Sequence, residues 1–186
     1  GTTVTVYGFV RGEAFYDFDF DQGDLSNTSG LNTATATDGA FNTSVRVSRL
    51  GFRLSSETDI GTIGGQLEYD LFGSGGTAEL RLRHANFTIN GWLVGQTWTN
   101  FMPIGQYPTS ADFNGAVGVP FTRQPQVRYT GTAGDLTYSF SIEEAAWVSE
   151  DPVVTAAVQY STDMFTGRLS AISGTVQEAG FEDDAY

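Results

Sequence analysis

Strict alternation of apolar and polar residues near the N-terminus most constrains how this chain can fold. The even positions from Val4 to Phe20 are all apolar or glycine, whereas the odd positions mix charged, hydroxyl and aromatic residues. A period of two residues indicates a β-strand with one apolar face, here sustained over about 18 residues. Strands of globular proteins are usually about 5–6 residues long. We therefore predict that this segment, 3–21, is a wall strand of a transmembrane β-barrel.

The alternation returns along the whole chain and predicts about nine strands in a single β-barrel domain over residues 1–186. The later predicted strands cover 41–55, 62–72, 79–89, 92–100, 122–130, 136–143, 154–160 and 165–171. Asn90-Gly91 is the strongest hairpin signal, and a slip in phase near His84 predicts a β-bulge. The acidic last ten residues, QEAGFEDDAY, predict a loop.

The connections between these strands alternate in length. Long segments at 21–41, 73–78, 101–121 and 144–152 alternate with short ones at 56–61, 90–91, 131–134 and 161–163. Outer-membrane barrels have long outer loops and short periplasmic turns, whereas a soluble β-sandwich has no such consistent rhythm. The predicted fold class is therefore all-β, an antiparallel transmembrane β-barrel of the porin type in the bacterial outer membrane.

The composition excludes several kinds of site. The net charge of −13 argues against nucleic acid as a partner. There is no cysteine, so disulfides and thiolate metal sites are excluded, and a single histidine excludes a multi-histidine zinc site. We expect no cofactor and no enzymatic activity. Acidic residues near strand ends favour a solvated rim, with Ca²⁺ binding or bridging to lipopolysaccharide as the alternative; they are Asp17, Asp19, Asp21, Asp24, Glu178, Glu182, Asp183 and Asp184.

All nine basic residues are arginine, and seven of them fall on the polar face of the predicted wall. They are Arg11, Arg49, Arg53, Arg81, Arg83, Arg128 and Arg168. Exclusion of charge from lipid explains the face, but not the choice of arginine. Rings of arginine select anions, and each guanidinium can hold a carboxylate with two hydrogen bonds. We predict that these residues line the pore and bind anions, with about half of them also paired to wall carboxylates.

Four segments are recognisable together: YGFVRGEAFYDFDF, SRLGFR, LRHANF and GQTWTNFM. In order and spacing they resemble the N-terminal portion of DcaP-like porins, over roughly residues 3–121. The resemblance implies a homotrimer of sixteen-stranded outer-membrane barrels that pass small organic anions, dicarboxylates among them. In trimeric porins the loop after the fifth strand folds into the pore. The resemblance therefore implies that 101–121 is the constriction loop, with Pro103, Tyr107, Asp112 and Phe113 as its candidate residues.

About nine strands do not close a sixteen-stranded barrel, and an open edge in lipid leaves backbone groups unpaired. We therefore expect a longer chain to complete the barrel; the alternative is a cryptic tenth strand that closes a small one. Two functions follow. The first is passive diffusion of small anions through an arginine-lined lumen. The second is a non-channel β protein of the outer membrane or cell surface, such as an adhesin, scaffold or filament subunit.

Overall fold

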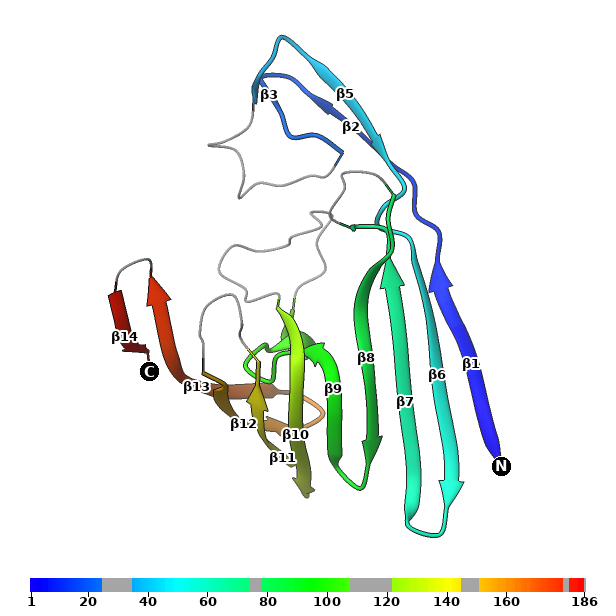
Figure 1. Cartoon of the computed structure of the whole chain (residues 1–186), viewed down its shortest axis with the longest axis vertical. Helices are drawn as coiled ribbons and strands as arrows, with labels where there is room; N and C mark the ends of the chain where they lie inside the picture. The colour runs from blue at the N-terminus through cyan, green and yellow to red at the C-terminus, as the bar shows by residue number, and fades with distance from the viewer. Residues whose placement is uncertain (25–34, 74–77, 108–121, 145–150, 179–180, 186) are drawn as a thin grey trace.

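The computed structural model of the chain describes residues 1–24, 35–73, 78–107, 122–144, 151–178 and 181–185 (Figure 1). Nearly all regular structure in these ranges is β-strand, and the one helical segment there is a 3₁₀ turn at Ile104–Gln106. Within the same ranges no helix has the length and apolar character needed to cross a bilayer. The all-β fold class is confirmed.

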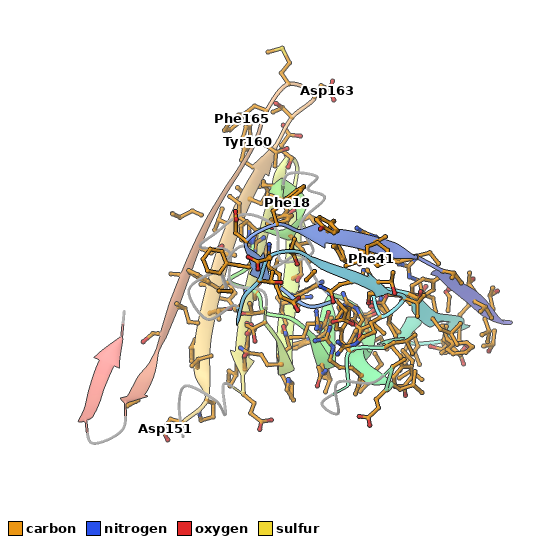
Figure 2. The ribbon with its side chains drawn as sticks, turned by 90° about the horizontal axis from the view of Figure 1, so that it is seen from above. Phe18, Phe41, Asp151, Tyr160, Asp163 and Phe165 are labelled. Atoms are coloured by element: carbon orange, nitrogen blue, oxygen red, sulfur yellow. The ribbon has the colours of Figure 1, made fainter. Side chains whose placement is uncertain are left out.

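Ten strands form one antiparallel sheet in which hydrogen-bonded neighbours follow one another in chain order after β1. They are β1 (Thr2–Phe9), β6 (Arg49–Thr58), β7 (Gly61–Asp70), β8 (Arg81–Ile89), β9 (Trp92–Trp98), β10 (Arg123–Ala133), β11 (Leu136–Glu143), β12 (Val153–Ser161), β13 (Thr166–Glu178) and β14 (Phe181–Ala185). In the described residues β1 and β14 are the two edges of this sheet. Seen from above, the sheet bends round instead of lying flat (Figure 2), as a wall segment of a barrel must.

The burial of this sheet is inside out compared with a soluble protein. Among the described residues only four apolar side chains are buried, whereas fourteen polar or charged ones are. The apolar side chains of the wall strands are instead exposed, including Val6, Leu50, Phe52, Phe87, Phe140, Ile142, Val154, Val158 and Leu169. An apolar outer surface around a polar interior is the arrangement that a lipid bilayer requires.

The predicted long first strand is interrupted, which corrects the prediction of one strand over 3–21. β1 ends at Phe9, and the chain resumes in two small ribbons beyond the main sheet: β2 (Glu13–Asp17) with β5 (Ala40–Ser44), and β3 (Phe20–Asp21) with β4 (Thr35–Ala36) (Figure 1). Between the paired segments, residues 10–12 lie opposite the longer segment 45–48. The unequal lengths break the ladder, although the alternation in the sequence continues.

The turns follow the prediction closely. Asn90 and Gly91 both have positive φ, +48° and +84°, as a type I′ hairpin turn requires. The short connections β6–β7, β8–β9, β10–β11 and β12–β13 lie at one end of the strands, and the long connections β1–β6, β7–β8, β9–β10 and β11–β12 lie at the other. The tail corrects the prediction of a loop, because Phe181–Ala185 pairs with Gly174–Glu178 as β14. An edge strand is held by backbone hydrogen bonds, so it forms here without the alternation that periodicity detects.

Candidate channel wall

A β-bulge in β8 determines which side chains line the polar face. Glu68 lies opposite His84, but the next residue, Tyr69, lies opposite Leu82, so Arg83 is the extra residue. The consecutive side chains of Arg83 and His84 are consequently both buried, at 3 % and 5 % exposure. Strict alternation would turn one of them towards lipid, where an arginine near the midplane costs about 2–4 kcal/mol. The bulge predicted near His84 is therefore confirmed.

Carboxylates of β7 hold the two arginines of β8. Arg81 donates from Nε and Nη2 to both oxygens of Asp70, at 2.9 and 2.6 Å. Arg83 donates from Nε to Glu68 at 2.6 Å and from Nη1 to Asp70 at 2.9 Å. The hydroxyl of Tyr7 on β1 also donates to Glu68, at 2.9 Å. We call Glu68, Asp70, Arg81 and Arg83 the ion-pair cluster.

Three further arginines beside this cluster rest on aromatic rings instead of on acids. The guanidinium carbon lies 5.3 Å from the ring centre of Phe9 for Arg49, 4.3 Å from that of Tyr7 for Arg53, and 4.4 Å from that of Trp98 for Arg123. In the part of the chain that the structure describes, none of the three forms an ion pair. Stacking orients a guanidinium and leaves its N–H groups available for another acceptor.

A different network lies on β10–β13, around the carboxylate of Glu143, which is 1 % exposed. It accepts hydrogen bonds from Gln124 Nε2 at 2.6 Å, Ser141 Oγ at 2.5 Å and Thr155 Oγ1 at 3.4 Å. It also accepts one from the backbone N–H of Asn100, at 2.8 Å. Neutral donors thus satisfy a buried charge, and one of them belongs to the segment that follows β9.

That segment, Thr99–Tyr107, lies against the polar face of the later strands. Arg168 Nη2 on β13 donates to the backbone carbonyl of Asn100 at 2.5 Å, and Ser139 on β11 donates to the Asn100 side chain at 2.7 Å. Farther along, Gln106 Nε2 donates to Gln159 Oε1 on β12 at 3.3 Å. The chain leaving the fifth strand of the main sheet therefore crosses its inner surface and does not project outward.

Comparison with known proteins decides the family. The chain matches the family model described as DcaP outer membrane protein over residues 1–140. It belongs to the DcaP outer membrane protein family. Its location is accordingly the bacterial outer membrane, as predicted, and no curated protein matches this DcaP-family chain.

Solved structures agree. The outer membrane channel DcaP of Acinetobacter baumannii is 27 % identical with a TM-score of 0.86, and the match covers 99 % of this chain and 57 % of that one. An anion-selective porin from Comamonas acidovorans, 17 % identical with a TM-score of 0.63, and a loop L8 deletion mutant of Vibrio cholerae OmpT, 16 % identical with a TM-score of 0.60, share the fold. The match covers 99 % of this chain in both, and 61 % and 60 % of theirs. The DcaP-family chain thus spans roughly three fifths of each.

The remaining predicted site residues of this DcaP-family chain are not gathered in one place. Arg11 lies beyond the outer end of β1 and pairs with Glu13 at 2.5 Å. Arg128 lies on β10, with its Nε buried and without a hydrogen-bond partner among the described residues. Pro103 and Tyr107 belong to the segment after β9, whereas Asp112 and Phe113 lie outside the described residues.

Sequence reasoning missed two members of the DcaP-family wall. Arg123 is not among the seven arginines predicted to line the pore, but it is the first residue of β10 and pairs in register with Trp98. Asn100, the last residue of the predicted strand 92–100, is not a predicted site residue, yet its backbone is held from both sides by Glu143 and Arg168. The buried acid at the end of β11 was the signal, since a carboxylate there needs donors from another segment.

The acidic outer residues of the DcaP-family chain have partners within the protein. Asp24 pairs with Arg46 at 3.0 Å, and Asp21 accepts from the Gly23 backbone N–H and from Asn42 Nδ2, both at 2.8 Å. These hydrogen bonds, that of Gly23 foremost, hold the pKa of the Asp21 carboxyl below its usual range. Across the described ranges no group of three or more histidine, aspartate or glutamate side chains is placed to hold a metal ion.

Proposed function

We propose that this protein forms an outer-membrane channel through which small organic anions, dicarboxylates among them, diffuse passively along an arginine-lined lumen. The charge of the inner wall carries the proposal. Strands β6–β13 contain seven arginines and five carboxylates. The arginines are Arg49, Arg53, Arg81, Arg83, Arg123, Arg128 and Arg168, and the carboxylates are Glu57, Glu68, Asp70, Glu143 and Glu178. These strands thus have an excess of two positive charges in a chain whose net charge is −13.

In this proposal the arginines of the ion-pair cluster, and the neighbouring arginines that stack on aromatic rings, are the successive binding sites of a permeating anion. Arg81 and Arg83 are held in place by Glu68 and Asp70, so a passing anion meets fixed charges and not flexible ones. The guanidiniums of Arg49 and Arg123, which form no ion pair among the described residues, lie beside them. A carboxylate can exchange bidentate contacts from one guanidinium to the next, which is how arginine rings conduct and select anions.

The segment after β9 forms the constriction in this proposal. The contacts of Asn100 and Gln106 with β11–β13 support it, because they lead the chain across the inner surface. The resemblance assigns the same segment, 101–121, to the inward loop of trimeric porins. The homotrimer and the contact with lipopolysaccharide that the family resemblance implies belong to the same proposal. Two similar structures, one an outer membrane channel and the other an anion-selective porin, favour it.

Entry of matched solutes into proteoliposomes tests the proposal. Succinate and 1,4-diaminobutane have the same four-carbon length and opposite charge, so their relative rates isolate charge from size. We expect succinate to enter faster by roughly tenfold, because the wall charge enriches anions locally. Faster entry of the diamine would overturn anion selection. Entry of neither solute would favour the non-channel alternative, an adhesin, scaffold or filament subunit.

A further inference from the structure

A hollow of about 480 Å³ opens on the polar face of β1, β6, β7 and β8, on the short-turn side of the ion-pair cluster. Two adjacent cross-strand rows form it. One row places Thr5, Arg53, Gln66 and Asn86 side by side, and the next places Thr3, Ser55, Gly64 and Thr88 side by side. Its volume lies within the range of small-molecule sites, about 300–1,000 Å³.

The hollow depends on a glycine. A Cβ atom built on Gly64 would lie 2.4 Å from Thr88 Oγ1, so any side chain there would occupy the floor of the hollow. The next residue, Gly65, points to the opposite face, where a Cβ would meet Leu54 Cβ at an ordinary 3.4 Å. Both glycines line the hollow with their backbone, but an added Cβ would enter it only at Gly64, so the two positions form a matched pair.

The hollow contains one positive charge and no neutralising acid. Arg53 stacks on Tyr7 at 4.3 Å and forms no ion pair in the described part of the structure. Tyr7 is itself fixed, because Gln66 Nε2 donates to its hydroxyl at 2.8 Å and that hydroxyl donates to Glu68 at 2.9 Å. Glu68 is already engaged by Arg83. The guanidinium of Arg53 is consequently oriented and available to an anion.

Hydroxyl groups surround this charge. The side chains of Thr3, Thr5, Ser55 and Thr88 line the hollow, and in the described residues none of their hydroxyls has a protein hydrogen-bond partner. Each hydroxyl can both donate and accept. The ion-pair cluster lies two residues farther along the strands. Its charged groups, in contrast to these hydroxyls, already bond to one another.

We propose that the hollow is a binding subsite for a hydroxylated monocarboxylate, a sugar acid of about six carbons. The carboxylate pairs with Arg53, and the hydroxyls of the solute exchange hydrogen bonds with those of the threonines and Ser55. A dicarboxylate has no second cation to meet here, and a neutral sugar leaves the guanidinium unpaired. The subsite rests on the proposed function, because solutes reach it through the lumen.

Block of chloride current through the native protein in planar bilayers tests the subsite. Gluconate and hexanoate each have six carbons and one carboxylate, and only gluconate has hydroxyls. Two or three net hydrogen bonds predict that gluconate half-blocks at a concentration lower by tenfold or more, about 1.4 kcal/mol per tenfold. Equal potency of the two acids overturns the subsite.

Variants separate the parts of the subsite. We expect Gly64→Ala to weaken the gluconate block about tenfold, whereas Gly65→Ala, the matched control, leaves it unchanged. Thr88→Val is expected to weaken the gluconate block and to spare hexanoate, whereas Arg53→Gln weakens both. Equal behaviour of the two glycine variants contradicts the site. Failure of the proposed function shows itself separately, as cation selectivity or lack of chloride current before any acid is added.

Discussion

Two regions of the inner wall treat buried charge in opposite ways. In the ion-pair cluster on β7 and β8, two carboxylates pair with two arginines, and the neighbouring Arg49, Arg53 and Arg123 leave positive charge over for a solute. Around Glu143 on β10–β13, one carboxylate is satisfied by neutral donors and by the backbone of the segment after β9. Carboxylates of the inner wall therefore have two different roles. Some fix the arginines of a permeation path, and one anchors the chain that crosses it.

The largest expected effect comes from Arg83, the most buried arginine of the cluster. Arg83→Gln leaves Glu68 without its guanidinium and Asp70 with one fewer donor. Removing one partner of a buried ion pair costs about 3–5 kcal/mol, which we expect in the free energy of unfolding measured with guanidinium in lipid bilayers. Arg11→Gln is the comparison, because the Arg11 side chain is 41 % exposed although its partner Glu13 is 8 % exposed, and we expect a smaller loss than for Arg83→Gln. Equal losses for the two variants would refute a special role for the cluster.

The Glu143 network comes next. Glu143→Ala removes the acceptor of the Asn100 N–H and of three side-chain donors, and we expect a loss of about 2–3 kcal/mol in unfolding free energy. We also expect noisier open-channel current, because the segment after β9 loses its anchor. Single-channel recording measures this directly. Glu144→Ala, at the exposed neighbouring position, should change neither quantity, and quiet current in the Glu143 variant would contradict the anchoring role.

The anion-to-cation permeability ratio also distinguishes the surroundings of the ion-pair cluster from the Glu143 network. Arg49 and Arg123 form no ion pair among the described residues, so replacing both with glutamine removes wall charge without unpairing a carboxylate. We expect the anion-to-cation permeability ratio to fall roughly threefold with little change in stability, as measured by zero-current potentials. Glu143→Gln serves as the comparison and should leave the ratio the same or raise it. An unchanged ratio in the double arginine variant would mean that solutes do not pass these residues.

The smallest effect lies at the outer tip, away from both regions. The folded pKa of Asp21 is lowered, so its contribution to local stability is present above the unfolded pKa and is lost as pH falls through the folded value. We expect Asp21→Asn to lower the protection factor of the Gly23 amide at neutral pH. In the unmodified protein we expect the same loss of protection as pH falls through the folded pKa, after the intrinsic pH dependence of amide exchange is divided out. Asp19→Asn is the control. Equal protection of the Gly23 amide in the unmodified protein and in the Asp21→Asn and Asp19→Asn variants would show that the Gly23–Asp21 hydrogen bond is not formed.

Much of the wall could be predicted because strand faces and turns depend on residues that are close together in the sequence. Alternation identifies the lipid face, Asn90-Gly91 identifies a hairpin, and the phase slip at His84 identifies the bulge. Pairing was not predictable, since the partners of Arg83 depend on the register that the bulge sets between β7 and β8. The anchoring of Asn100 by Glu143 joins segments 43 residues apart, which no periodicity encodes. The strand Phe181–Ala185 was missed because backbone pairing at an edge leaves no trace in side-chain pattern.

The central claim is that the excess arginine of the inner wall selects anions. The zero-current potential of the native protein in a planar bilayer, across a tenfold gradient of potassium chloride, tests it most directly. We expect a potential of the sign set by chloride, which shrinks when Arg49 and Arg123 are replaced. A potential of the sign set by potassium would contradict it.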